Sequence, residues 1–136
     1  EKLVKLPRSR LYFNGECMLK IELGKKRRSR RKLSIRKKIF GTSSEPRMSV
    51  FRSNKYMYVQ VIDDTTGKTL ASASSLAYDH DKFKLNKVTC EKVGEEIALK
   101  LLKLKIDTVV FDRNGFLYTG KIKHLADSAR KNGLKF

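Results

Sequence analysis

After Pro46 the apolar residues alternate with polar ones, which is the spacing of strands that bury one face. "RMSVFRS" predicts one strand, and "YMYVQVID" predicts a second in which Met57, Val59 and Val61 share a face. "DDTTG", residues 63–67, predicts a turn, and "KTLASASS" predicts a third strand. Because short connections join these segments, we expect an antiparallel meander.

The rest of the chain changes to helical spacing, interrupted once. One apolar stripe lies at Val93, Ile97, Leu101 and Leu104, after Asn86 in the place of an N-cap. "DTVVF" predicts a short buried strand and "DRNG" a turn. A second stripe lies at Ile122, Leu125, Ala126 and Ala129, before a C-terminal Gly133. The order βββαβα predicts an α/β domain with a mixed sheet and helices on one face, since a strand-helix-strand crossover normally pairs in parallel.

The length of 136 residues is that of one domain with an extension. The two cysteines, Cys17 and Cys90, form no C-x-x-C pair, so we expect neither a disulfide nor a zinc site, and a reducing compartment. Because no run of eighteen apolar residues is present, we expect a soluble chain.

Charge is distributed unevenly. The formal net charge is +18, and residues 1–55 carry 18 basic against 4 acidic side chains. "KKRRSRRKLSIRKK", residues 25–38, contains ten cations and no carboxylate. So much like charge predicts a polyanionic partner, a nucleic acid or an anionic membrane surface. We expect a helix from an N-cap at Ser29 to Phe40, closed by Gly41, which becomes ordered only against that partner, with "TSSEP" after it as a linker.

Three functions fit a basic run of this kind. A nuclear-localisation or DNA-binding patch needs only clustered Lys and Arg. A membrane-surface helix needs bulky apolar residues on its other side, and those present are few: Leu33, Ile35, Ile39 and Phe40. An RNA-binding arm needs charge for phosphates beside a folded domain with aromatic, Arg and amide groups. This chain carries both parts, so we expect an RNA partner and no membrane partner.

A metal-dependent nuclease is the enzymatic alternative, because Asp63, Asp64 and Asp112 stand at predicted strand ends. Their turn motifs explain them more simply. His80 and His124 have no partner at metal-ligand spacing, so we expect both to be solvated. We therefore predict no enzyme, no catalytic residue, no metal and no cofactor.

Two segments of the folded domain are candidate RNA-docking surfaces. The first is the ridge "FRSNKYMY", and the second is "DRNGFLYTGKIK", a glycine-rich turn leading to a helix N-terminus that suits a phosphate. A polar hairpin turn and an ordinary strand-to-helix loop would explain them equally well.

Four blocks in order resemble one family: "PRMSVFRSNKYMYVQVIDD", "TLASASS", "VGEEIA" and "VVFDRNGFLYTGKIKHLADSARKNGLKF". Residues 27–136 are similar to the bacterial-type large-subunit ribosomal protein eighteen. The resemblance implies a structural constituent of the large ribosomal subunit that binds 5S ribosomal RNA and attaches it to the large ribosomal RNA in the central protuberance, beside neighbouring ribosomal proteins there. Thr119 and Lys121 depart from the residues common in the family, and residues 1–24 have no clear counterpart. The segments "VQVIDDT" and "TLASASS" favour a plastid (chloroplast) ribosome over a bacterial one.

The expected organisation is an extension (1–24), a basic RNA-binding segment with its linker (25–45) and a globular α/β 5S-rRNA-binding domain (46–136). The predicted RNA-binding residues are Lys25, Lys26, Arg27, Arg28, Arg30, Arg31, Lys32, Arg36, Lys37, Lys38, Arg47, Arg52, Ser53, Asn54, Lys55, Tyr56, Arg113, Tyr118, Lys121 and Lys123.

Overall fold

The computed structural model describes residues 19–78 and 85–136, with side chains from residue 27 onward. The predictions made for Cys17, His80 and the side chains of Lys25 and Lys26 lie outside the described residues. The elements are α1 (Leu19–Arg36), β1 (Arg47–Arg52), β2 (Met57–Asp63), β3 (Lys68–Ser74), a 3-10 turn η1 (Ser75–Ala77), α2 (Lys87–Lys103), β4 (Val110–Asp112) and α3 (Lys121–Lys131).

The four strands form one sheet in the order β3-β2-β1-β4. β1 pairs with β2 and β2 with β3 in antiparallel fashion, whereas β4 pairs with β1 in parallel. The expected mixed sheet and βββαβα order of the domain are confirmed. The parallel pair arises because the chain crosses over through α2 before it returns beside β1.

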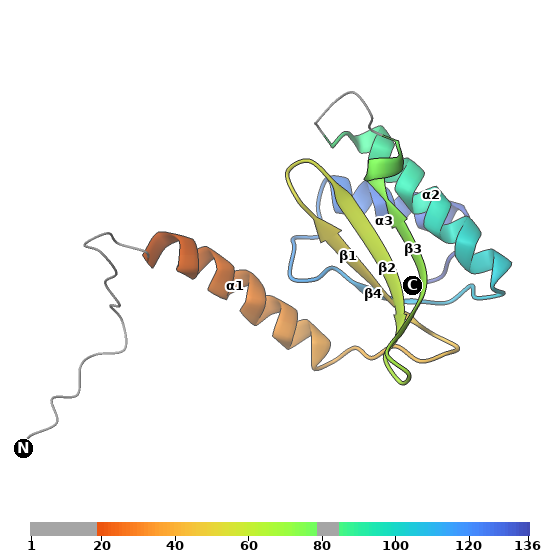
Figure 1. Ribbon diagram of the computed structural model, residues 1–136, viewed down its shortest axis with the longest axis horizontal. Coiled ribbons are helices and arrows are strands. Elements are labelled where there is room, and N and C mark those ends of the chain that lie inside the picture. The colour runs from red at the N-terminus through yellow and green to blue at the C-terminus, as the bar shows by residue number, and fades with distance from the viewer. Residues whose placement is uncertain (1–18, 79–84) are drawn as a thin grey trace, which may run out of the picture.

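Helices α2 and α3 cover one face of the sheet (Figure 1). Met57, Val59 and Val61 of β2 are fully buried there, as their alternation predicted. The apolar stripe predicted for α2 was wrong at its last residue, because Leu104 is exposed and forms the C-cap of the helix. The buried face of α2 includes Gly94 instead, where a Cβ would collide with the backbone of α3. The close packing of α2 against α3 therefore requires a residue without a side chain at position 94.

The prediction for the basic segment was wrong at both ends of the helix. α1 begins at Leu19, so Ser29 lies inside it and is not an N-cap. Residues 19–28 contain many good helix formers, Leu, Lys, Arg and Glu among them, and these outweigh the local cap signal. Gly41 does not close the helix: its N–H donates to Asp64 Oδ2 at 2.9 Å, and its carbonyl accepts from the Asp64 N–H at 3.1 Å.

Two further segments differ from expectation. "TSSEP" is a fixed turn, because the Thr42 N–H donates to the Glu45 carbonyl at 2.9 Å and the Ser43 hydroxyl donates to Asp63 at 2.8 Å. The last strand was predicted over residues 107–111, but β4 ends on Asp112. Asp112 is thereby drawn into the sheet and is fully buried. Within residues 19–78 and 85–136, no helix has the length and apolar character needed to cross a membrane.

Candidate nucleic-acid interface

One side of α1 contacts the domain through two arginines that lie eight residues, about two helical turns, apart. The Arg28 guanidinium lies over the ring of Phe116, 4.3 Å from its centroid, and 5.4 Å from that of Phe51. Arg36 Nε donates to Asp112 Oδ2 at 3.1 Å. Cation–π and ionic contacts thus replace the missing apolar stripe. The expectation that the segment orders only against a polyanion is corrected, because the domain itself seats this half of the helix.

Gly115 makes the close approach of α1 possible. Its φ is +77°, and a Cβ at this position would lie 2.6 Å from the Arg28 carbonyl oxygen, which is too close for any side chain. The turn in "DRNG" was predicted from composition alone. Its glycine is required both by the backbone conformation and by the neighbouring helix.

Replacing Gly115 by alanine is expected to lower the free energy of unfolding by about 2 kcal/mol, because it combines backbone strain with a collision against α1. Gly67→Ala is the matched control: φ there is +68°, and no atom lies within 4 Å of an added Cβ. The control should cost about 1 kcal/mol from strain alone. Hydrogen exchange of α1 should accelerate in the Gly115 variant only, and equal exchange in both variants would contradict the contact.

A buried ionic cluster lies under the end of α1. Arg47 donates to Asp64 through Nε at 2.7 Å and Nη2 at 2.6 Å, and to Asp112 through Nη1 at 3.0 Å. Arg47 is 8% exposed. The hydrogen bonds and the charge of Arg47 hold the pKa of Asp64 below its usual range. Arg47 is thus committed to two carboxylates inside the fold, and its RNA contact stays a prediction.

The cluster makes stability depend on pH. The Asp64 pKa is lower in the folded chain than in the unfolded one, so its contribution is fully present above the unfolded value, near 3.8. That contribution is lost as pH falls through the folded value. The urea midpoint should therefore decrease below about pH 4, and the Asp64→Asn variant should show a shallower decrease. An identical pH profile in the variant would remove Asp64 from this linkage.

The opposite side of α1 presents unneutralised charge. Arg27, Arg30 and Arg31 are exposed and, with Ser34, line a shallow depression. No carboxylate among the residues with described side chains pairs with these three arginines. Lys32, on the fastened side, has a pKa lowered by burial and then by the neighbouring charges of Arg36 and Arg28. The helix therefore keeps one group of cations for the domain and another for a ligand.

The sheet face away from α2 and α3 carries a row of aromatic rings. The Phe51 ring centroid is 6.2 Å from that of Tyr58 and 6.0 Å from that of Phe116, and Tyr56 lies 6.5 Å from Tyr58. Phe51 and Tyr58 are paired in register across β1 and β2. Phe51 is 40% exposed. Exposed rings beside arginine are groups that can stack on unpaired bases.

Contacts at this row join three segments that were predicted separately. Arg28 of the basic run lies over Phe51 of the ridge and over Phe116 of the "DRNGF" loop. All three rings stand in the two segments predicted as docking surfaces, but the residue set drawn from those segments omitted Phe51, Tyr58 and Phe116. Alternation places the first two on the face opposite the core. Phe116 carries no such signal.

The ridge itself ends in a tight turn. Ser53 N–H donates to the Tyr56 carbonyl at 2.8 Å, and the Tyr56 N–H donates to Ser53 Oγ at 2.8 Å. Ser53 is thus used by the turn, whereas Arg52 and Lys55 are exposed beside it. The polar-turn interpretation therefore describes Ser53, and Arg52 and Lys55 are exposed at the end of the ridge.

The second predicted cluster is divided. Arg113 Nη1 donates to the Phe116 carbonyl at 2.9 Å, which places it at the ring row. Tyr118 accepts from Arg130 Nη1 at 2.8 Å and packs against Phe111, so it belongs to a C-terminal cluster instead. Lys121 and Lys123 lie in the first turn of α3, whose N-cap is Gly120.

The carboxylates proposed for a metal-dependent nuclease accept hydrogen bonds within the protein. Asp63 accepts hydrogen bonds from Ser43, Thr65 and Thr66, and these hold its pKa below its usual range. Asp112 accepts from the Asn114 N–H at 2.8 Å, the predicted turn contact. Within the described part of the chain, no three His, Cys, Asp or Glu residues are grouped to hold a metal ion.

The fold and this surface define a class: an α/β domain with a cationic helix held beside exposed aromatic rings, in the manner of RNA-associated proteins. The family described as ribosomal L18 of archaea, bacteria, mitochondria and chloroplast matches residues 23–136. This chain belongs to that ribosomal protein family. It is therefore a structural constituent of the large ribosomal subunit and not an enzyme.

Curated relatives agree over most of their length. The chain is 56% identical over 111 residues to the large ribosomal subunit protein uL18 of Treponema denticola, covering 82% of this chain and 92% of that protein. It is 57% identical over 110 residues to that of Bacteroides thetaiotaomicron, covering 81% and 95%. The protein of Pseudothermotoga lettingae is 52% identical over 122 residues, covering 88% and 100%.

Proposed function

We propose that this chain binds 5S ribosomal RNA and helps attach it to the large ribosomal RNA in the central protuberance. The observation that carries the proposal is the seat of Arg28 on Phe51 and Phe116. This contact holds the cationic helix α1 beside the sheet face that carries the aromatic rings. Cations supply affinity for phosphates, and rings with polar groups can distinguish one RNA shape from another. The family resemblance supplies 5S ribosomal RNA as the partner.

Within this proposal the predicted residues take three roles. Exposed cations of α1 and the segment after it neutralise phosphates, and these are Arg27, Arg30, Arg31, Lys37 and Lys38. Arg52 and Lys55 of the ridge and Arg113 of the "DRNGF" loop select the RNA. Arg28 and Arg36 orient the arm against the domain.

Competitive binding tests the proposal. The full chain is offered 5S ribosomal RNA and a transfer RNA of similar length at one near-physiological salt concentration, since affinities depend strongly on salt. We expect a preference of at least about tenfold for the 5S RNA, which corresponds to about 1.4 kcal/mol. Equal affinities would leave only a non-specific basic nucleic-acid-binding or targeting module.

Discrimination between RNAs should fail when Arg52 of the ridge or Arg113 of the "DRNGF" loop is replaced. In Arg52→Gln and Arg113→Gln variants we expect the preference for 5S RNA to decrease about tenfold or to vanish, because a lost selective contact costs about 1–3 kcal/mol. Lys37→Gln is the control, and it should lower the affinities for both RNAs about equally. If all three variants lost affinity for the two RNAs in the same ratio, the ridge would not be a specificity element.

The compartment is proposed only at the level of the large ribosomal subunit. The plastid host expected from "VQVIDDT" and "TLASASS" has no support among these relatives, which are bacterial. The division of the chain at residues 24 and 25 is likewise retained only as a proposal, and it falls inside α1.

A further inference from the structure

The sheet face away from α2 and α3 carries a second row of side chains beside the aromatic rings. The register pairs Ser49 of β1 with Gln60 of β2, and Gln60 with Ser72 of β3. In β1 and β2 this row lies two residues from Phe51 and Tyr58, and therefore on the same face. Because neighbouring strands lie about 4.8 Å apart, the row is about 10 Å wide. Ser49, Gln60 and Ser72 are termed the polar row.

The polar row has hydrogen-bonding groups that the domain does not use. Gln60 and Ser72 are exposed, and Ser49 is half-buried. Within residues 19–78 and 85–136, none of these three side chains makes a hydrogen bond to the rest of the chain. Two hydroxyls and one carboxamide together offer donors and acceptors without any net charge. The row is thus a neutral hydrogen-bonding surface on a very basic chain.

At the β4 end of the polar row the neighbouring charges are paired. Asp112 is in register with Ser49 and is fully buried. It accepts hydrogen bonds from Arg36 Nε at 3.1 Å and from Arg47 Nη1 at 3.0 Å. The arginines that reach this end are therefore held by a carboxylate of the domain.

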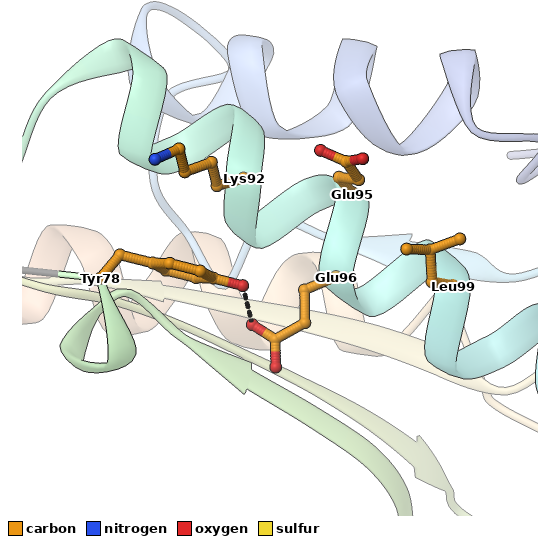
Figure 2. Close-up of a pocket in the computed structure, with 5 residues that line it drawn as sticks. All are labelled: Tyr78, Lys92, Glu95, Glu96 and Leu99. Atoms are coloured by element: carbon orange, nitrogen blue, oxygen red, sulfur yellow. Dashed lines mark hydrogen bonds between the residues drawn. The ribbon is translucent and has the colours of Figure 1, made fainter.

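At the β3 end, helix α2 holds the row in place. Lys100 Nζ donates to the Ser72 carbonyl at 2.7 Å and to Glu96 Oε1 at 2.6 Å. The Tyr78 hydroxyl donates to the other carboxylate oxygen of Glu96 at 2.7 Å, as Figure 2 shows. These bonds tie the edge strand β3 to α2, so the backbone that carries Ser72 is fixed. They also pair the charge of Lys100 within the domain.

Neutral groups of this kind favour one class of partner. Protein interfaces centre on large apolar or aromatic anchors and are poor in serine, and the polar row has no such anchor. A phosphate on the row would lose water without meeting an unpaired cation. A ribose 2'-hydroxyl is neutral and both donates and accepts, as these side chains do. The wide, shallow minor groove of an RNA helix displays such hydroxyls, and a flat row of short side chains can face it.

We propose that the polar row contacts ribose 2'-hydroxyl groups of the RNA that binds beside it, and that these contacts distinguish RNA from DNA. The rings of Phe51 and Tyr58 and the guanidinium of Arg28 lie next to the row, so one RNA covers both. This inference rests on the part of the proposed function that brings RNA to this sheet face. It does not rest on the choice of 5S RNA.

A double-substitution experiment tests the proposal. The 5S ribosomal RNA is made with sparse 2'-O-methyl nucleotides at random positions, and the molecules that the full chain binds are separated from the rest. Positions where methylation excludes the RNA mark 2'-hydroxyl contacts. The variant with Ser49→Ala, Gln60→Ala and Ser72→Ala should lose this interference at a group of neighbouring positions. It should also bind unmodified RNA about tenfold more weakly, because several hydrogen bonds are lost.

Deoxynucleotides at the identified positions complete the cycle. They should weaken binding by the native chain about fivefold and binding by the triple variant hardly at all, because the partner groups are already gone. Gln60→Ala alone should lose part of the interference pattern, and urea unfolding shows whether each variant is folded. Thr108→Val is the control: it removes a hydroxyl that bonds to Asp107 outside the sheet face, and it should keep the native pattern.

Three results would overturn the proposal. One is a native chain that shows no interference by 2'-O-methyl groups, and another is a folded triple variant that keeps the native pattern. The third is an equal loss from deoxynucleotides in the native chain and the variant. Unchanged RNA affinity of the variant would leave this face to a protein partner. A chain that bound 5S RNA and transfer RNA equally would still give an interference pattern on either RNA, so failure of the proposed selectivity is a separate result.

Discussion

Replacing Asp112 by asparagine is expected to lower the free energy of unfolding by about 3 kcal/mol. The carboxylate is fully buried and accepts from Arg47 at 3.0 Å and from Arg36 at 3.1 Å. Without the charge of Asp112, Arg47 remains buried with one carboxylate in place of two. Helix α1 also loses the ion pair between Arg36 and Asp112. Urea unfolding should show the loss directly, and hydrogen exchange should show that α1 becomes less protected than the strands.

The control for this variant is Asp127→Asn, since Asp127 pairs at 3.6 Å with Arg130 on the surface of α3. Exposed pairs contribute little, so its free energy of unfolding should change by less than about 1 kcal/mol. If the Asp112 variant were equally stable, the cluster would not hold α1 against the sheet. RNA binding by that variant should also weaken, because the arm is no longer aligned with the ring row.

Replacing Arg27, Arg30 and Arg31 together by glutamine is expected to reduce RNA affinity about 100-fold at physiological salt, for 5S RNA and transfer RNA alike. Each phosphate contact contributes a slope of about −0.7 to −0.9 to the dependence of log affinity on log salt. Three lost contacts should therefore make the slope shallower by about 2 to 3. Titrations at several salt concentrations measure both quantities, and stability should be unaffected because the three side chains are exposed.

A triple variant with the same charge change separates placement from net charge. Lys87, Lys103 and Lys131 are exposed on α2 and α3, and their replacement by glutamine also removes three cations. We expect a much smaller change in slope, because these residues lie away from the arm. Equal slopes in the two triple variants would mean that the chain attracts RNA through its overall charge and that α1 is no dedicated contact.

Local pattern was sufficient for the core of the domain. Alternation placed Met57, Val59 and Val61 on the buried face, and helical spacing placed Val93 and Ile97. These predictions succeed because burial is periodic along a strand or a helix, and the period is written in the sequence. The same argument failed at Leu104, where the helix ended one residue earlier.

The sequence predicted the segments of the candidate site but not the contacts between them. The basic run and the ridge were visible as composition, but their meeting through Arg28, Phe51 and Phe116 depends on contacts between residues far apart in the chain. Arg47 shows another limit of this reasoning. The resemblance named it as an RNA contact, and only the structure showed that it lies inside the fold, between Asp64 and Asp112.

The sequence by itself determined the order of elements, the buried stripes, the polyanionic partner and the family, because each depends on local spacing or on charge. Only the tertiary structure decided how the cations divide between structural and outward roles. That division arises from the parallel return of β4 beside β1, which carries Asp112 and the Phe116 loop to α1. The order of elements predicted a parallel strand after α2, but the strand it pairs with is set by the packing of the whole chain.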